Sequence, residues 1–164
     1  MDAIYEQLIT TQKTSIYSAC NMLVYIIGGI GLLSTGVNIL IAIPFIVIAA
    51  ALYFYKGNFY LEFQYDFING EIDVDKIIEM KKRKKVISFN IKQVELLALE
   101  NSDHVKDYSK AASKTISALS TTCSAKVYNA YIFQDNQVVK LRFAPDEKFL
   151  DLCYKYNPRV VKKY

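Results

Sequence analysis

The apolar and charged positions divide the chain into two unlike parts. No charged side chain lies between Lys13 and Lys56, whereas charged residues occur at ordinary density elsewhere. A helix needs about 20 predominantly apolar residues to cross a bilayer, so the uncharged stretch suffices for two crossings. Turn-forming residues cluster near its middle, namely Ser34, Thr35, Gly36 and Asn38. The pattern therefore predicts a transmembrane hairpin over residues 16–56, with helices at about 16–34 and 38–55.

The charges that flank this hairpin predict its orientation. Its central turn is uncharged, Lys13 precedes the first helix, and Lys56 and a run of basic residues follow the second. Because positive residues accumulate on the cytoplasmic side, we expect both the N and C termini to be cytoplasmic. A cleaved signal peptide is not expected, because the chain starts with acidic rather than basic residues. The alternative is a buried hairpin in a soluble protein, which the remaining chain is too short to cover.

Residues 1–15 precede the predicted hairpin. Their apolar side chains recur at helical spacing, at Ile4, Tyr5, Leu8 and Ile9. This spacing predicts a short helix that lies in the membrane interface. A frayed terminus is the alternative for this segment.

Small residues predict where the two long helices pack against each other. Close helix contacts in membranes use such residues, and the candidates here are Gly28, Gly31 and Thr35. No ionisable side chain other than Tyr and Cys lies within the predicted spans. That absence disfavours an ion-coupled transporter that acts alone.

Residues 57–164 show the alternation of half-buried strands. Residues 59–67 read FYLEFQYDF and place every second side chain on an apolar face. Asn69-Gly70 then favours a tight hairpin. This turn predicts two cross-strand pairs, Phe67 with Ile72 and Tyr65 with Val74. Further strands are expected over residues 86–91 and 94–100.

A second hairpin and a helix are expected toward the C-terminus. Strands over residues 125–133 and 137–143 flank a turn at Asp135-Asn136. Residues 144–156 have the pattern of an amphipathic helix with Pro145 in its first turn. The buried stripe of this helix is expected to contain Phe149, Leu150, Cys153 and Tyr156.

Residues 103–122 separate the two groups of strands. Apolar residues would share one face of a helix, namely Val105, Tyr108, Ala112, Ile116 and Leu119. Three lysines form a stripe beside them, at Lys106, Lys110 and Lys114. We favour a helix packed on the sheet with a solvated lysine face. The alternatives are a basic amphipathic helix on an anionic membrane surface and a disordered loop rich in Ser and Thr.

These elements together predict an α+β membrane protein: a transmembrane helical hairpin, then a mostly antiparallel β domain with a C-terminal helix. This order is similar to that of pleckstrin-homology-like (PH-like) domains. Two spans followed by FINGEIDVDKI, KKRKK and LRFAPDEKFLDLCYKYNPR resemble a family of small two-span membrane proteins of clostridial bacteria. The resemblance covers nearly the whole chain. It implies a bacterial cell (inner) membrane location and a cytoplasmic PH-like domain, and it brings no catalytic motif.

The basic run consists of Lys81, Lys82, Arg83, Lys84 and Lys85. It lies between two predicted strands, so we expect a hairpin turn or a strand edge, where lysines also block unwanted strand pairing. On the cytoplasmic side these residues face a leaflet with anionic lipids. Simple solvation and contact with lipid or a partner both remain open, and Lys106, Lys110 and Lys114 are further candidates for the same contact.

Few residues suit catalysis or metal binding. His104 is the single histidine and has no apparent nucleophile or orienting partner. The three cysteines, Cys20, Cys123 and Cys153, lack the spacing of metal ligands. An acidic strand face, formed by Asp66, Glu71, Asp73 and Asp75, is interpreted as solvated and neutralised by nearby lysines. The net charge of +4 does not favour nucleic acid. We therefore expect no catalytic residue, no metal and no cofactor.

The composition and motifs favour a non-enzymatic, membrane-anchored protein whose cytoplasmic domain binds a protein, a peptide or an anionic lipid surface. Its expected partners are the lipid bilayer and, through the transmembrane helices, another protein or a second copy. The alternative is an accessory subunit of a larger membrane complex such as a transporter. A third hypothesis is an enzyme with an unrecognised site.

Overall fold

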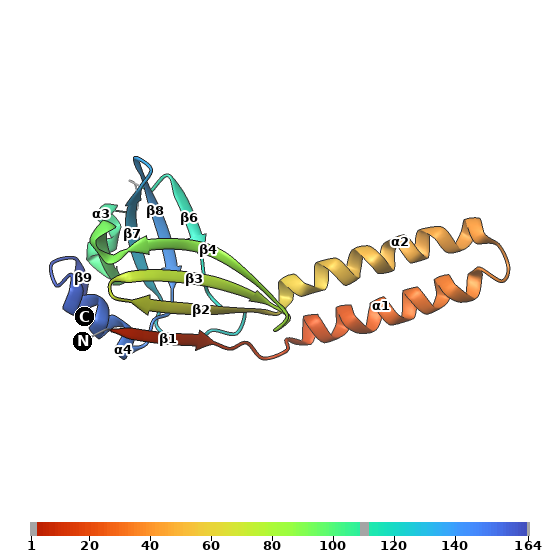
Figure 1. Cartoon of the computed structure of the whole chain (residues 1–164). Coiled ribbons are helices and arrows are strands. Elements are labelled where there is room, and N and C mark those ends of the chain that lie inside the picture. Colours follow the sequence, from red (N-terminus) through yellow and green to blue (C-terminus); the bar gives the residue numbers. More distant parts are fainter. Residues whose placement is uncertain (1–2, 109–111, 164) are drawn as a thin grey trace.

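Two apolar helices form the hairpin that the charge pattern predicts. In the computed structural model, which describes residues 3–108 and 112–163, α1 spans Ser15–Ser34 and α2 spans Ile39–Lys56. Thr14 Oγ1 caps α1 and Asn38 Oδ1 caps α2 by accepting backbone N–H groups. Both helices are long and apolar enough to cross a membrane. They project from the sheets as a separate arm (Figure 1).

The N-terminal segment is a strand, so the predicted interfacial helix is wrong. β1 (Ile4–Ile9) pairs antiparallel with β2 (Leu61–Ile68), with Tyr5 opposite Phe67. Gln7 explains why the alternation is hard to see in the sequence. Its side chain turns toward the core side, where Nε2 donates to the Ala144 carbonyl and Oε1 accepts from the Asp146 amide. A polar residue therefore occupies an inward position and interrupts the apolar pattern.

One sheet has the order β1-β2-β3-β4. β3 (Glu71–Ile78) and β4 (Lys82–Asn90) follow β2 through two tight turns. In the first turn Asn69 and Gly70 have φ of 51° and 95°, the left-handed conformations that this hairpin type needs. The predicted pairs are confirmed, because Phe67 lies opposite Ile72 and Tyr65 opposite Val74.

The other sheet has the order β6-β8-β7-β5-β9. The hairpin of β7 (Tyr128–Gln134) and β8 (Gln137–Phe143) turns at Asp135-Asn136, as predicted. β5 (Val94–Leu99) pairs with β7, and the short β9 (Val161–Lys162) adds a parallel partner. Two 3₁₀ turns, η1 (Gly57–Phe59) and η2 (Ile91–Gln93), connect elements of the chain.

The single helix predicted over residues 103–122 is wrong. α3 (Asp103–Tyr108) is one short helix, and β6 (Lys114–Ser117) pairs parallel with β8. The predicted helical face cannot form, because Ile116 belongs to a strand. β-Branched residues such as Thr115 and Ile116 fit a pleated surface well. The edge of β8 provides backbone hydrogen-bond partners, which make this segment a strand rather than a helix.

The core lies between the two sheets and is closed by α4 (Glu147–Tyr156). Phe149 from α4 is fully buried and makes edge contacts with Tyr65, Phe67 and Phe143. Asp146 caps α4, so Pro145 precedes the helix rather than lying in its first turn. Of the predicted stripe, Phe149, Leu150 and Cys153 are buried and Tyr156 packs at its margin.

The pairing of β1 with β2 changes the domain organisation. The helical hairpin is an insertion between two adjacent strands of the β domain, rather than a segment that precedes the domain. Residues beyond β1 continue this contact, since Thr11 Oγ1 donates to the Leu61 carbonyl at 2.5 Å. The β domain therefore includes β1 and does not begin at residue 57.

Candidate functional site

The base of the hairpin is joined to the domain by a buried lysine. Lys56 ends α2 and is only 7% exposed. Its Nζ donates to Asn21 Oδ1 of α1 at 2.7 Å and lies 3.9 Å from Glu79 Oε1 in the β3–β4 turn. The same ammonium lies 4.7 Å from the centre of the Tyr53 ring. A buried charge is tolerated only when it is paired, so these contacts connect both helices to the turn.

Backbone contacts bring the β3–β4 turn still closer to the hairpin. The Glu79 amide donates to the Tyr60 carbonyl at 3.1 Å. A Cβ on Gly57 would lie 3.1 Å from Ile78 Cγ2, so a larger residue there would push the two segments apart. Tyr17 of α1 also contacts Tyr60, with ring centres 5.4 Å apart. The turn that precedes the basic run is therefore held against the base of the hairpin.

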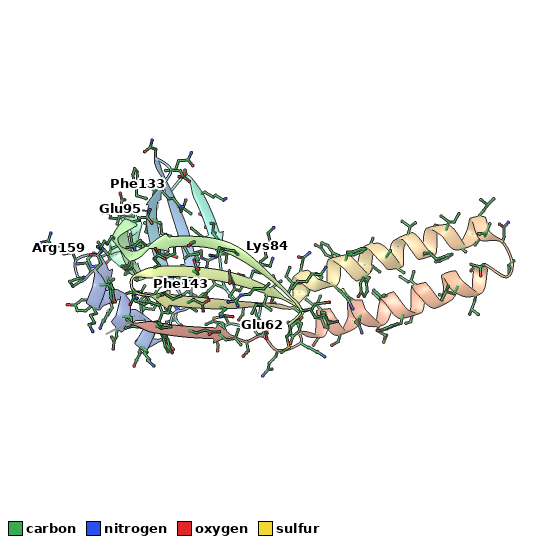
Figure 2. All side chains as sticks on the ribbon, in the orientation of Figure 1. Glu62, Lys84, Glu95, Phe133, Phe143 and Arg159 are labelled. Carbon is green, nitrogen blue, oxygen red and sulfur yellow. The ribbon has the colours of Figure 1, made fainter. Side chains whose placement is uncertain are left out.

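The basic run occupies this turn and the start of an edge strand. Lys81 lies in the turn, and the other four residues belong to β4, at the edge of its sheet. Figure 2 shows Lys84 at the end of the domain next to the hairpin, whereas Glu95 and Arg159 lie toward the opposite end. Of the two predicted arrangements, the structure has a strand edge that begins immediately after a turn.

Strand alternation divides the basic run between two faces of the sheet. Arg83 and Lys85 lie on the face that carries the acidic residues of β2 and β3. Arg83 Nε contacts Asp75 Oδ2 at 2.6 Å and its Nη2 contacts Asp66 Oδ2 at 3.2 Å. Lys85 Nζ contacts Asp73 Oδ2 at 2.9 Å. These pairs neutralise much of the acidic strand face, as the sequence predicts.

These ion pairs also affect the pKa of Asp73. Partial burial raises the pKa of the carboxyl group, but hydrogen bonds from Ser88 and Lys85 outweigh it, and the pKa falls below its ordinary value. Asp73 therefore stays ionised at neutral pH and keeps Lys85 engaged. Arg83 and Lys85 are accordingly poor candidates for binding an external anion.

The remaining basic residues near the hairpin are not engaged in this way. Within the described residues, the side chains of Lys81, Lys82 and Lys84 are exposed and take part in none of the ion pairs. Lys84 lies directly opposite Lys76 of β3. Like charges opposite each other destabilise a sheet, and an anion that binds between them removes that repulsion. We call Lys76, Lys81, Lys82 and Lys84 the open basic edge.

Of the other predicted lysines, Lys106 and Lys114 do not belong to this edge. Lys106 lies in α3, which sits at the end of the domain away from the hairpin (Figure 1), and its Nζ contacts Asp103 Oδ1 at 2.6 Å. Lys114 begins β6 in the other sheet, and Lys110 lies outside the described residues. Lys106 therefore lies away from the open basic edge, and its contact with an anionic surface or a partner stays a prediction.

Within the hairpin, the glycines and Thr35 have different surroundings. A Cβ on Gly31 would lie 3.1 Å from both Phe45 Cβ and Ile46 Cγ1, and one on Gly28 would lie 3.7 Å from Ala49 Cβ. These two glycines face α2. Thr35 instead lies in the exposed turn, where its hydroxyl donates to the Leu32 carbonyl at 2.6 Å.

The residues considered for chemistry are dispersed. Among the described residues there is no group of three or more His, Cys, Asp or Glu that could hold a metal ion. His104 lies in α3. Cys153 is buried in the core, and burial raises the pKa of its thiol to about 12. A thiol with so high a pKa is not a nucleophile at neutral pH.

Sequence reasoning missed Lys56, Asn21, Glu79 and Lys76 as parts of this site. Lys56 gave a signal, because it is the first charged residue after the uncharged stretch. Its partner Glu79 is distant in sequence and its partner Asn21 lies within a predicted span. Glu79 comes close to Lys56 because β3 runs antiparallel to β2 and brings the β3–β4 turn back to the end of α2.

Comparison with known proteins places the chain in a family. Residues 1–163 match the family described as Bacterial PH-like domain (DUF6106), so the chain belongs to that family. No curated protein and no solved structure matches the chain significantly. The match covers the hairpin as well as the sheets, which agrees with a hairpin inserted within the domain.

Proposed function

We propose that this member of the bacterial PH-like domain family is a non-enzymatic, membrane-anchored binding protein. Its helical hairpin holds the PH-like domain against the cytoplasmic face of the cell membrane. The open basic edge then binds an anionic lipid surface. The observation that carries the proposal is the contact of the β3–β4 turn with the base of the hairpin, which keeps the edge beside the leaflet.

The topology supports the orientation. Because β1 and β2 are paired, the two ends of the inserted hairpin must lie on the same side of any membrane that it crosses. Lys13 and Lys56 flank those ends, and positive residues favour the cytoplasmic side. The N-terminal strand and the remainder of the domain are then cytoplasmic together.

The expected binding energy follows from the position of the open basic edge. A Lys near an anionic leaflet contributes about 1 kcal/mol, and the attraction falls off within a Debye length of about 8 Å. Three exposed lysines would supply roughly 3 kcal/mol, or about a hundredfold in affinity. Lys106 is at the wrong end of the domain for this contact.

Replacing the open lysines should abolish salt-dependent vesicle binding. The test uses a chain in which residues 13–59 are replaced by Asn-Gly, so that binding does not arise from the hairpin. Flotation with vesicles containing phosphatidylglycerol should fall at least tenfold in K81E/K82E/K84E and in high salt. This variant leaves Arg83 and Lys85 with their aspartates, so it does not disturb the acidic face.

The matched control for this experiment is K92E/K155E/R159E, which makes the same charge change on exposed residues. Figure 2 shows Arg159 at the end of the domain away from the hairpin. It should bind nearly as well as the parent chain. Equal binding to phosphatidylcholine vesicles, or equal loss in both variants, would contradict electrostatic binding through the open basic edge.

A second candidate function is that of an accessory subunit in a larger membrane complex. The observation that favours it is an apolar groove of about 410 Å³ along the hairpin, lined partly by Tyr25, Gly28 and Gly29. Among the described residues, no atom beyond the adjoining backbone of α1 lies within 4 Å of a Cβ placed on Gly29, so a neighbouring helix can approach the backbone there.

Purification from mild detergent tests this second function. A membrane partner should co-purify in stoichiometric amount with the parent chain and be lost with Gly29→Leu, which fills the groove without a clash inside the chain. Recovery of the protein alone under conditions that preserve membrane complexes would argue against an accessory role.

A further inference from the structure

A small cavity lies where the end of α2 meets the β3–β4 turn. Its volume is about 140 Å³, and its lining includes Tyr53, Phe54, Gly57, Lys81 and Lys82. A single water requires only about 10–15 Å³ measured this way, so the cavity has room for a phosphate group. Ile78 and Glu79 complete the lining.

The walls of this cavity have two different chemistries. Tyr53 and Phe54 contribute an aromatic wall, with ring centres 5.8 Å apart in an edge contact. Lys81 and Lys82 also line the cavity, and their ammonium groups are the donors available to bind phosphate oxygens by charge-assisted hydrogen bonds. Glu79 does not cancel this positive character, because its carboxylate is paired with Lys56.

The position of the cavity identifies the source of the phosphate. Tyr53 and Phe54 occupy the last turn of an apolar helix, and aromatic residues at such positions lie at the level of lipid headgroups. Lys81 and Lys82 approach that level from the domain side. A ligand that contacts both walls has an apolar part in the bilayer and a phosphate at its surface.

We infer that this cavity binds the phosphate of one anionic glycerophospholipid from the cytoplasmic leaflet. Lys81 and Lys82 bind the phosphate oxygens, and the Tyr53–Phe54 wall packs against the glycerol and the upper acyl chains. The inference rests on the membrane anchoring in the proposed function. It adds a stoichiometric lipid site to a surface attraction that by itself has no defined stoichiometry.

Native mass spectrometry of the full chain in a maltoside detergent tests the site. Short-chain phosphatidylglycerol should saturate at one molecule per chain and bind more tightly than phosphatidylcholine. K81A/K82A should weaken this binding at least tenfold. The matched control K92A/K155A removes two exposed lysines elsewhere and should bind like the parent chain. Free glycerol phosphate, added in the same concentration range, should not displace the lipid.

Several outcomes would overturn the inference. Equal lipid binding by both variants excludes the cavity lysines, and displacement by glycerol phosphate assigns the site to a soluble phosphate compound.

Failure of the cavity site can be distinguished from failure of the proposed function. If K81E/K82E/K84E loses vesicle flotation while K81A/K82A keeps its single lipid, the surface binding stands and the cavity site is wrong. If flotation is insensitive to salt while the single lipid still depends on Lys81 and Lys82, the surface binding alone is wrong.

Discussion

A chain that starts at residue 57 is expected not to fold, whereas a chain that keeps β1 and replaces the hairpin by a short loop is expected to fold and be soluble. Removal of residues 1–56 strips β2 of its antiparallel partner over residues 63–68. It also removes Gln7, which hydrogen-bonds the Ala144 carbonyl and the Asp146 amide. Each buried polar group left unsatisfied costs about 1–3 kcal/mol.

The packing lost with β1 adds to this cost. Tyr5 contacts Phe149, with ring centres 6.5 Å apart, and its hydroxyl donates to the Asp146 carboxylate at the start of α4. Since a domain of this size has a stability of about 5–15 kcal/mol, losing three polar contacts, an aromatic contact and the strand pairing should remove most of it. Cooperative thermal unfolding by circular dichroism should be seen for the loop-replaced chain and not for 57–164.

The loop-replaced chain provides the control for this experiment. In it residues 13–59 become Asn-Gly, which suits the tight turn that joins two antiparallel strands. The turn then joins Gln12 to Tyr60, in register with the pairing of β1 and β2, and Thr11 keeps its contact with Leu61. Comparable melting temperatures for the two chains would show that β1 is dispensable. Insolubility of both would show instead that the domain needs the hairpin itself.

Replacing Lys56 by Met should free the domain to move relative to the hairpin. The substitution removes the cation that connects Asn21 with Glu79 and leaves the Glu79 carboxylate partly buried without its partner. Removing one member of a buried ion pair typically costs about 3–5 kcal/mol. Because Glu79 keeps some access to water, we expect about 3 kcal/mol, which is roughly a hundredfold in the docking equilibrium.

Distances between spin labels on Val37 and Lys84 measure this change in the reconstituted chain, with Cys20 and Cys123 replaced by Ser. The distance distribution should be narrow in the parent and clearly broader in K56M. The double variant K56M/E79Q should have a distance distribution narrower than that of K56M, because no unpaired charge is then buried. Lys13→Met is the control, because it removes an exposed lysine from the segment that connects β1 to α1. A distribution in K56M as narrow as that of the parent would exclude a locking role.

Local signals were sufficient for the hairpins and the long helices. Asn69-Gly70 and Asp135-Asn136 adopt positive φ, and each turn sets the register of its two strands without help from distant residues. The helical hairpin was equally readable, because an uncharged stretch of that length admits few other structures. The family resemblance was visible in segments that span both parts of the chain.

Other elements depended on partners that are remote in sequence. β1 was misassigned because inward Gln7 finds its hydrogen bonds on the segment before α4. The segment that contains β6 has a helical apolar pattern, yet the edge of β8 makes Ile116 part of a strand. In both cases backbone pairing with a distant strand outweighed a local periodicity.

The sequence by itself determined the hairpin of apolar helices, the two tight strand turns and the position of the basic run between two strands. The tertiary structure alone decided that the hairpin is an insertion between paired strands, that Lys56 joins it to the β3–β4 turn, and that the basic run is divided between two faces. The physical reason is the range of the interactions. Helix and turn formation depend on neighbouring residues, whereas strand order and ion pairing depend on which distant segments meet in the folded chain.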